Sequence, residues 1–568
     1  MENQKVAKIL NEIADMLEMK GVAFKPRAYR KAAQTVQSLS KDIKDVKEEG
    51  KLAELPGVGQ SIADKIVEIL ETGKLTYYEQ LKKDYPLDFE ALLSIEGMGP
   101  ETVKLLYEQL QVKNLEDLED AARQHKIRKI KGLGEKTEQN ILENIARTKG
   151  KTDRKLLGYV LPVAQELMVK LKGFSGIGKI EIAGSLRRKK ETIRDIDILV
   201  TSSKPKELMD YFTSLDVVEK VIAKGKTKST VRLKEGLECD VRLVEEEAFG
   251  SALVYFTGSK QLNIEMRKIA LKKDLKLNEY GLFNDKNVRI AGKTEQEVFG
   301  KLGMQYIEPE LRESRGEVQA SMEDKLPALI GYDDLRGDLH VHTKWSEGTY
   351  SIEDMAMAAK DLDYEYMAFT DHAGNLPIAR SLTDEKLEDQ MKTIDKLNEK
   401  LDGLTLLKGA EVNIKSNGEI DVKNSVLKEL DVVVASVHSG LREGKSTMTK
   451  RVVLAMENEN VDIIAHPTGR KIGERMGYEL DFDEIFETAH KTGTFLEINS
   501  YPDRLDLSDV NIRSAIESKC KLVISTDSHN IEHLRYSSLG IATARRGWAQ
   551  KSDIVNTSTL ENFKKQLK

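Results

Sequence analysis

The sequence has little cysteine and no long apolar run. Its two cysteines, Cys239 and Cys520, lie far apart among 568 residues, which argues against a disulfide framework or a zinc knuckle and fits a reducing cytoplasm. No stretch of about 18 consecutive apolar residues occurs, so no membrane-spanning helix is expected. The first residues, MENQKVAKILNEIADMLEMKG, have the pattern of an amphipathic helix rather than that of a secretion signal. The sequence therefore predicts a cytoplasmic protein without membrane contact.

Charge is distributed unevenly along the chain. Within the net charge of −6, residues 151–315 carry 32 Lys and Arg against 25 Asp and Glu, whereas residues 316–568 have an excess of acidic side chains. A basic region suits a polyanionic partner, and an acidic region suits bound cations. A chance imbalance of surface charge is the alternative, because charge alone is weak evidence about function.

Three short segments of the helical region 1–150 resemble one another. Each has an apolar residue, one further residue, Gly-x-Gly and an amphipathic helix: LPGVGQSIADKI (55–66), IEGMGPETVKLL (95–106) and IKGLGEKTEQNI (130–141). Glycine permits the tight turn, which presents the free N–H groups of the following helix to an anion. This helix–hairpin–helix pattern grips nucleic-acid backbone without reading sequence, with plain helix turns as the alternative. The glycines expected to bind DNA are Gly57, Gly59, Gly97, Gly99, Gly132 and Gly134.

Residues 151–315 alternate helices with strand-like runs, which is typical of an α+β unit. In RDIDILV (194–200), Asp195 and Asp197 alternate with apolar residues, so both carboxylates point to one face of a strand. Asp240 in ECDVRLV adds a third carboxylate from another predicted strand. Like charges this close repel unless a cation lies between them, and oxygen ligands favour Mg²⁺ or Mn²⁺. Two such ions suit in-line attack at phosphorus, whereas a polar strand face is the alternative.

The order and spacing of several motifs across residues 1–315 resemble the family X DNA polymerases, to which DNA polymerase beta belongs. The motifs are RAYRKAA (27–33), LPGVGQSIADKI, Gly-Ser at 184–185 ahead of the three aspartates, and YFTGSKQLNIEMR (255–267). The resemblance implies that Asp195, Asp197 and Asp240 are catalytic and hold the metal ions. It also implies a site for the incoming nucleotide, formed by Arg154, Gly184, Ser185, Arg188, Tyr255, Phe256, Gly258, Asn263 and Arg267.

Lys65, in the segment IADKI, stands where family members with lyase activity carry a Schiff-base lysine. A desolvated lysine is a nucleophile toward the sugar of an abasic site. Ser61 stands where a phosphate-binding lysine is expected, and Lys65 also fits an ordinary solvated lysine on an amphipathic helix. The sequence leaves both interpretations open.

From residue 334 on, seven apolar runs each end in polar residues that are able to bind metal. They are DLHVHT, EYMAFTDH, TLLKGAEVN, VVVASVHS, VDIIAHPTG, TFLEINS and KLVISTDSH. Helix-like stretches separate these runs, which predicts a parallel sheet closed into a barrel with its chemistry at the C-terminal strand ends. Six of the nine histidines lie at these ends, whereas we expect His125, His490 and His533 on the surface.

The set HxH…TDH…E…H…HP…DSH resembles the polymerase and histidinol phosphatase domain, called PHP. The resemblance implies up to three ions, held by His340, His342, Glu411 and Asp527, by Glu411, His438 and His466, and by Glu347, His372 and His529. Mixed histidine and carboxylate ligands suit Mn²⁺, Zn²⁺ or Fe²⁺. The expected chemistry is phosphoester hydrolysis with a metal-activated water, and Arg470 in HPTGR is expected to help neutralise the phosphate.

The expected architecture is multidomain, with an α-helical helix–hairpin–helix region, an α+β nucleotidyltransferase palm with a thumb, and a (β/α)7-like PHP barrel. The expected boundaries are 1–80 for a helical, lyase-like DNA-binding domain, 81–150 for a helical domain with two further hairpins, 151–243 for the palm, 244–315 for the nucleotide-binding thumb, 316–333 for a linker and 334–568 for the PHP domain.

We therefore expect a DNA-directed DNA polymerase that fills gaps in DNA repair, including base excision repair. Its PHP domain would supply 3′–5′ exonuclease activity, with 3′-phosphatase and AP endonuclease as related reactions. The expected partners are gapped or nicked DNA and dNTPs, and the expected state is a monomer. Two alternatives stay open: a DNA-binding repair scaffold with structural metals, and a template-independent nucleotidyltransferase fused to a small-molecule phosphatase.

Overall fold

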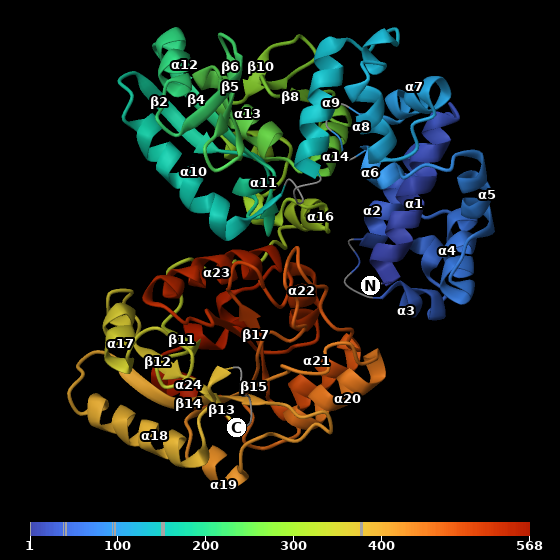
Figure 1. Ribbon diagram of the computed structural model, residues 1–568. Coiled ribbons are helices and arrows are strands. Elements are labelled where there is room, and N and C mark those ends of the chain that lie inside the picture. Colours follow the sequence, from blue (N-terminus) through green and yellow to red (C-terminus); the bar gives the residue numbers. More distant parts are fainter. Residues whose placement is uncertain are drawn as a thin grey trace. The chain divides into compact units, whose positions relative to one another are not determined.

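The computed structural model describes residues 2–37, 39, 42–93, 95, 98–148, 154–374 and 379–568. The chain forms two compact units, Met1–Asp153 and Arg154–Lys568 (Figure 1). Among the described residues, no helix combines the length and the hydropathy that a bilayer crossing requires.

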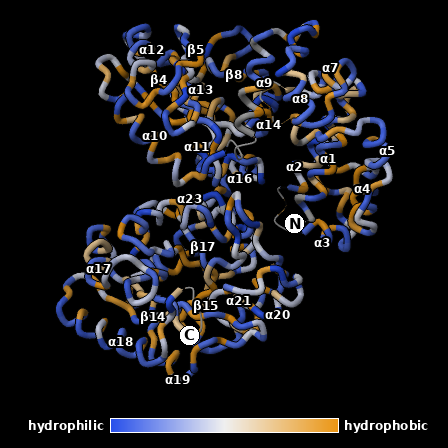
Figure 2. The backbone as a smooth tube through the Cα atoms, viewed as in Figure 1, coloured by the Kyte–Doolittle hydropathy of each residue, from blue (hydrophilic) through white to orange (hydrophobic). Residues whose placement is uncertain are grey.

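The first unit is helical throughout its described elements. Leu10, Ile13 and Leu17 recur at helical spacing on one face of α1 and are buried, as an amphipathic helix requires. Figure 2 shows the corresponding alternation of hydrophobic and hydrophilic segments along the helices. The elements are α1 (Glu2–Met19), α2 (Lys25–Gln37), α3 (Ile43–Glu48), η1 (Leu52–Glu54), α4 (Gln60–Thr72), α5 (Thr76–Asp84), α6 (Phe89–Leu93), α7 (Pro100–Leu110), α8 (Leu115–Arg123), η2 (Ile127–Lys129) and α9 (Glu135–Thr148).

The second unit begins with a five-stranded sheet in the order β2-β4-β7-β6-β5. Ile196 and Ile198 pack into the core shared with α10 and α12, whereas Leu199 packs on the opposite face with α13. The alternation predicted for β4 therefore sets its two aspartates on the face that carries α13. The elements are β1 (Lys155–Leu156), α10 (Leu157–Lys172), β2 (Ile177–Ile182), α11 (Gly184–Arg187), β3 (Thr192–Ile193), β4 (Asp195–Ser202), α12 (Pro205–Thr213), β5 (Val218–Lys224), β6 (Lys228–Leu233), β7 (Glu238–Leu243) and α13 (Phe249–Thr257).

A small three-stranded sheet and short helices follow the palm. Buried Glu295 joins these elements to the palm, because its carboxylate accepts hydrogen bonds from Arg187 at 2.7 and 2.8 Å and from Arg312 at 2.7 Å. Burial raises the pKa of Glu295, but Arg312 and Arg187 outweigh it and lower the pKa to about 2. The elements are α14 (Lys260–Leu271), β8 (Lys276–Asn278), β9 (Gly281–Phe283), β10 (Arg289–Ala291), α15 (Glu295–Lys301), η4 (Pro309–Leu311) and α16 (Glu317–Met322).

Replacing Glu295 by alanine should destabilise the second unit by about 3–5 kcal/mol, because the buried guanidinium of Arg312 and the half-buried one of Arg187 lose their counter-charge. We expect the thermal unfolding transition of the unit, measured by calorimetry, to fall by several degrees. The matched control is Glu219→Ala, which removes an exposed carboxylate on β5 and should leave the transition unchanged. Equal transitions for the two variants would contradict this assignment.

The C-terminal part of the second unit confirms the predicted barrel. All seven predicted runs form strands, and these pair in parallel in the order β11-β12-β14-β15-β16-β17-β18. A parallel bridge from Val341 to Ser528 joins the two ends of this order. The strands are β11 (Gly337–Val341), β12 (Tyr366–Phe369), β13 (His372–Ala373), β14 (Thr405–Asn413), β15 (Val432–Ser436), β16 (Ile463–Ile464), β17 (Phe495–Asn499) and β18 (Leu522–Ser525).

Helices cover the barrel between its strands (Figure 1). They are α17 (Ile352–Lys360), α18 (Asp384–Asn398), α19 (Asn424–Leu427), α20 (Lys445–Met456), α21 (Phe482–Thr492), α22 (Asp509–Glu517), η6 (Ile531–Tyr536), α23 (Ser537–Arg546) and α24 (Leu560–Lys564). The strands are buried along their length, as expected for a parallel sheet that is covered on both faces.

The palm and the barrel share a hydrophobic core. Leu505 and Leu539 from the barrel side are buried in the cluster that contains the palm helix α10. Residues 316–333, for which the sequence indicates a linker, contain α16 and pack too: Val318 and Leu329 join a cluster that Trp548 also contacts. The backbone N–H of Ile330 donates to the carbonyl of Ala549 at 3.0 Å, so this segment is held against the barrel.

Candidate active sites

The structure brings the three palm aspartates together. Strands β4 and β7 run parallel in a register that places Asp197 directly opposite Asp240, with Asp195 two residues before Asp197 on the same strand face. Thr230 Oγ1 donates to Asp240 at 2.5 Å, Lys228 Nζ lies 2.6 Å from the other Asp240 oxygen, and Asp195 pairs with Arg194 at 3.0 Å. These carboxylates offer only oxygen ligands, which suits Mg²⁺ or Mn²⁺.

The central aspartate shows the electrostatic cost of this cluster. Burial raises the pKa of Asp197 to about 6, and the charges of Asp195 and Asp240 add to the rise. A divalent cation between the carboxylates would relieve this repulsion, so the side chains fit a bound metal ion.

The raised pKa of Asp197 predicts that cation binding in the palm weakens in mild acid. Below about pH 6 a proton competes with the cation for this carboxylate, whereas an ordinary aspartate would titrate only near pH 4. We expect the Mg²⁺ concentration that half-saturates nucleotide insertion to rise roughly tenfold between pH 7 and pH 5. DNA affinity measured at both pH values is the control, and a flat profile would contradict the prediction.

The predicted phosphate-binding residues surround this cluster. Gly184 has φ +64° and lies so close to Asp197 that a Cβ at this position would overlap the carboxylate. Ser185 follows it at the start of α11 and is half-buried. The close approach explains why glycine precedes serine here and why the backbone lies beside the carboxylates.

Two predicted arginines lie near the same edge. Arg154 donates to Thr192 through Nε at 2.9 Å and through Nη2 at 2.6 Å. Burial lowers its pKa, Asp195 opposes this effect, and the cations Arg194 and Arg188 add to it. Arg188 donates from Nε to Glu313 at 3.0 Å and from Nη1 to the carbonyl of Thr257. Several cations therefore converge near Asp195, as a polyphosphate site requires.

The predicted sugar and base contacts lie where α13 meets α14. The rings of Tyr255 and Phe256 pack edge to face with centroids 5.0 Å apart, and Gly258 ends α13 with φ +68°. The Asn263 amide donates to the carbonyl of Tyr255 at 2.7 Å, and Arg267 Nε donates to the carbonyl of Asn263 at 3.1 Å. The structure thus brings these five residues together between the end of α13 and the first turns of α14.

The three hairpins of the first unit share one local structure. In each, the middle residue of Gly-x-Gly is a buried apolar side chain, namely Val58, Met98 and Leu133. Its backbone N–H donates to the carbonyl three residues earlier, at 2.9, 3.0 and 3.0 Å, in that order. The second glycine of each motif directly precedes α4, α7 or α9, so the free N–H groups of each helix follow the turn.

Five of the six predicted DNA-binding glycines are placed in these turns. Gly57 and Gly132 have φ +84° and +95°, which favours glycine, and Gly59 and Gly99 are the N-caps of α4 and α7. Gly134 accepts a hydrogen bond from Glu138 N at 3.1 Å in the first turn of α9. Gly97 lies outside the described residues.

Lys65 lies on α4 next to Ser61. Its Nζ donates to the carbonyl and the hydroxyl of Ser61, both at 3.0 Å, and lies 5.3 Å from the ring centroid of Tyr77. Ser61 lies in the first turn of α4. The amine of Lys65 is therefore held near the N-terminal end of this helix, beside the first hairpin turn at residues 56–59.

All nine predicted ligands of the barrel meet at the C-terminal strand ends. Glu411 lies at their centre and is 1% exposed. Five histidine nitrogens lie within 3.4 Å of its carboxylate: His340 Nε2 at 3.3 Å, His342 Nε2 at 3.4 Å and His372 Nδ1 at 3.1 Å from Oε2, and His438 Nε2 and His466 Nε2 at 3.3 Å from Oε1.

Two further carboxylates flank this centre. Asp527 Oδ1 lies 3.3 Å from His342 Nε2 and 3.7 Å from His529 Nδ1. Glu347 Oε1 lies 2.9 Å from His529 Nε2 and 3.2 Å from His372 Nε2. The carboxylate at position 347 therefore faces the same histidines that the sequence pattern grouped with it.

The donor atoms form three groups that could each hold one ion. They are His340, His342 and Asp527; His342, Glu347 and His372; and His372, Glu411 and His438. His342 and His372 belong to two groups each, which differs from the partition that the PHP resemblance implies. The buried ring nitrogen His340 Nε2 and both ring nitrogens of His342 have no hydrogen-bond partner among the described residues. Bound cations would satisfy these atoms, so the residues fit a metal centre.

Two buried residues that the sequence analysis missed orient the ligands from behind. Glu497 Oε1 lies 2.7 Å from His340 Nδ1, and its other oxygen accepts from the backbone N–H of His466 at 2.5 Å. Asn499 Nδ2 donates to Glu497 at 3.2 Å and to Asp527 at 3.1 Å. Partners of this kind fix the ring orientation of metal-binding histidines. The sequence signal for these two residues was the strand-like run TFLEINS, in which Glu497 and Asn499 alternate with an apolar residue.

The arginine beside the metal ligands is Arg504 rather than Arg470. Arg504 Nε lies 3.5 Å from Asp527 Oδ2, and although burial lowers its pKa, Asp527 and Glu411 outweigh this effect and raise it. Arg470 instead donates to the Arg504 carbonyl and to Glu191 of the palm, both at 2.8 Å. The sequence pattern could not distinguish them, because Arg504 reaches the site only through the loop after β17.

Of the three histidines expected on the surface, His125 and His490 are exposed, whereas His533 is half-buried. His125 pairs with Glu138 at 2.9 Å, and His490 lies on α21. His533 Nδ1 lies 3.4 Å from the backbone N–H of the predicted ligand His529. Its position beside the metal centre follows from the turn between β18 and η6.

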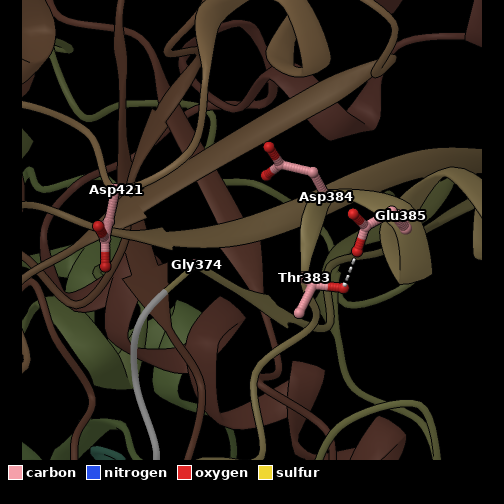
Figure 3. A pocket seen from close by; sticks show the side chains of 5 residues that line it. All are labelled: Gly374, Thr383, Asp384, Glu385 and Asp421. Carbon is pink, nitrogen blue, oxygen red and sulfur yellow. Dashed lines mark hydrogen bonds between the residues drawn. The ribbon is translucent and has the colours of Figure 1, made fainter.

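An open acidic pocket lies beside β13 (Figure 3). It is lined by Gly374, Thr383, Asp384, Glu385 and Asp421, and Thr383 Oγ1 donates to Glu385 at 3.2 Å. None of the predicted ligands lines this pocket. The cluster of predicted metal ligands and the pocket are therefore separate features of the barrel.

Known proteins resemble this chain along its whole length. Family descriptions match at residues 1–75 (helix-hairpin-helix domain), 89–147 (SAM-like helix-hairpin-helix tandem), 252–313 (DNA polymerase beta thumb) and 338–501 (PHP domain). The chain is 38% identical over 572 residues, 100% of both chains, to the DNA polymerase/3'-5' exonuclease PolX of Bacillus subtilis (strain 168).

Two other relatives each match a part of the chain. DNA polymerase lambda of Rattus norvegicus is 27% identical over 340 residues, which cover 55% of this chain and 56% of that protein. A probable phosphatase of Thermoanaerobacter sp. (strain X514) is 32% identical over 203 residues, which cover 34% of this chain and 78% of that protein.

Proposed function

Because this chain belongs to the family X DNA polymerases that carry a C-terminal PHP domain, we propose that it fills short gaps in DNA during repair and trims 3′ ends. Its substrates would be gapped or nicked DNA and dNTPs, and it would act as a monomer. Two cysteines that are buried and unpaired, Cys239 and Cys520, support a place in the reducing cytoplasm. The functions would divide at the domain boundaries that the sequence suggests, except that residues 316–333 pack against the barrel instead of forming a free linker.

In the palm, Asp195, Asp197 and Asp240 would hold Mg²⁺ or Mn²⁺. Such ions activate the primer 3′ hydroxyl and stabilise the leaving pyrophosphate. The triphosphate would be bound by Arg154, Ser185 and Arg188. Arg188 would exchange its ion pair with Glu313 for a contact with the triphosphate. Tyr255, Phe256, Gly258 and Asn263 would position the sugar and base, and Arg267 would contact the template side. The hairpin glycines would bind DNA phosphates without reading the bases.

In the PHP domain, the nine histidine, glutamate and aspartate ligands would hold up to three ions of Mn²⁺, Zn²⁺ or Fe²⁺. When bound, these ions would supply an activated water and would polarise the phosphate. Glu497 and Asn499 would keep His340 and Asp527 in position, and Arg504 would neutralise the scissile phosphate. The reaction would be 3′–5′ exonuclease cleavage, with 3′-phosphatase and AP endonuclease activity on related phosphoesters. Lys65, held beside the first hairpin, is the candidate lyase nucleophile.

The observation that carries this proposal is that one chain brings three aspartates together in the palm and nine histidine, glutamate and aspartate side chains together in the barrel. A 5′-labelled primer across a short gap, with Mn²⁺, tests it with and without dNTPs. The primer should lengthen with dNTPs and shorten without them. Asp195→Ala should lose only lengthening, and His340→Ala should lose only shortening. Shortening that survives His340→Ala, or vanishes with Asp195→Ala, would refute this division of labour.

A further inference from the structure

Three aromatic rings form a cluster at the edge of the PHP metal centre. His533 stacks on Tyr536 with ring centroids 5.1 Å apart and planes 17° apart. The ring of Tyr501 meets both edge to face, with centroids 5.2 Å from His533 and 5.5 Å from Tyr536. All three side chains are half-buried, so part of each ring remains accessible.

The backbone joins this cluster directly to the metal ligands. His533 Nδ1 lies 3.4 Å from the N–H of His529, whose ring is 2.9 Å from Glu347. The carbonyl of Tyr501 accepts from the N–H of Arg504 at 2.9 Å, in the turn that carries the Arg504 side chain to Asp527. The rings and the arginine therefore share one loop beside the ligands.

The palm helix α10 closes the other side of the cluster. Gly158 packs so closely on Pro502 and Leu539 that a Cβ would overlap both side chains, so the start of α10 lies beside the loop 501–505. Tyr159 is 59% exposed. Burial raises the pKa of Tyr536, and Tyr159 adds to the rise.

We propose that Tyr501, His533 and Tyr536, with Tyr159 at the rim, form a stacking subsite for the unpaired base of the nucleotide whose phosphate is cleaved. This inference rests on the proposed 3′–5′ exonuclease activity. A base offers a flat π-face of any sequence, and aromatic side chains bind that face without hydrogen-bond readout. Arg504, three residues after Tyr501, places a cation where the phosphate of the same nucleotide must lie.

The subsite predicts that cleavage depends on the presence of a base on the 3′-terminal nucleotide as well as on its phosphate. A paired terminal base must leave its duplex stack before it can occupy these rings. The histidine and tyrosine rings would contribute contact area at low entropic cost, as in other sites that bind single strands.

The test compares two single-stranded substrates, one with a normal 3′-terminal nucleotide and one whose terminal nucleotide lacks the base. The parent enzyme should cleave the normal end with a kcat/KM about 5- to 150-fold higher, which is the contribution of stacking one base. The double variant Tyr501→Leu, Tyr536→Leu should lose this preference and cleave both ends at similar rates. Tyr501→Phe should retain it.

Hydrolysis of bis(p-nitrophenyl) phosphate reports whether the metal centre is intact, because this substrate has no nucleobase. The double variant should keep the parent rate within about twofold. His490→Leu, which removes an exposed ring on α21 at the opposite end of the barrel strands, is the matched control and should keep the base preference.

Each result has a distinct meaning. An equal preference for the base in parent and double variant, or no preference in the parent, would overturn the stacking subsite while the exonuclease assignment stands. Parallel loss on both DNA ends and on the small substrate would assign the rings to packing and would also overturn it. A parent enzyme that shortens no DNA would refute the proposed exonuclease itself.

Discussion

Replacing Asp197 by asparagine should reduce primer extension by roughly a thousand-fold or more while primer shortening continues at the parent rate. Asp197 lies directly opposite Asp240, so its loss removes the oxygen ligand at the centre of the palm cluster. Metal ions contribute several kcal/mol to the transition state of phosphoryl transfer, and about 1.4 kcal/mol corresponds to a factor of ten in rate. Single-nucleotide insertion on gapped DNA would measure the effect.

The variant should fold as well as the parent or better. The pKa of Asp197 is raised to about 6 from an ordinary value near 4, so its ionised form costs stability at pH values above 6. Asparagine removes that charge, and the metal-free variant should therefore show an equal or higher unfolding temperature. Reduced extension combined with a lower unfolding temperature would indicate misfolding rather than a lost ligand.

The matched control is Asp210→Asn. Asp210 is an exposed aspartate on α12 that pairs with Lys224, and its loss should leave extension unchanged. Extension by Asp197→Asn at more than about one tenth of the parent rate would contradict a metal-binding role.

The palm cluster was predictable because it depends on local rules. A strand alternates its side chains, so Asp195 and Asp197 were placed on one face from sequence alone. The pairing of Asp197 with Asp240 depends on the parallel register of β4 and β7, which are separated by two other strands in the sequence. The run ECDVRLV indicated Asp240 as a third carboxylate on another strand, but no local pattern specifies the register that sets it opposite Asp197.

The PHP ligands were predictable for the same reason, and their supporting residues were not. Polar residues at seven successive strand ends must meet when the barrel closes. Glu497 acts on His340 from 157 positions away, and Arg504 reaches Asp527 through a loop. Both depend on how the strand order closes, so single-sequence reasoning predicted that the nine candidate ligands meet and missed the residues behind them.

The contact between palm and barrel could not be predicted from the sequence. Arg546 of α23 donates to the carbonyl of Arg188 at 2.8 Å and to Glu313 at 3.1 Å, while Glu313 accepts from the Arg188 side chain. Arg546 is also paired with half-buried Asp509 at 2.6 Å. Arg546 and its three partners come from four separate segments of the chain, and only the packed unit shows that a predicted nucleotide contact is held by the barrel.

Replacing Glu411 by glutamine should abolish 3′-end shortening and deplete the barrel of metal, while extension stays within about twofold of the parent rate. Both oxygens of Glu411 face histidines, three on one side and two on the other, so this single carboxylate connects most of the ligand set. Glutamine has the same shape but carries no charge and offers one oxygen. Since loss of a supporting residue alone typically costs 10–100-fold in metal affinity or activity, loss of this central ligand should cost about 100-fold or more.

Metal content by elemental analysis and shortening of a 5′-labelled strand measure the two effects on the same preparation. The matched control is Glu419→Gln in the exposed turn after β14, which should keep both metal and activity. If Glu411→Gln loses metal but still shortens DNA, the ions are structural and another site cleaves. If it keeps its full metal content and loses shortening, Glu411 acts on the substrate or the attacking water, and the metals depend on the remaining ligands. Loss of both, with extension intact, would establish that the barrel is a metal-dependent nuclease that works independently of the palm.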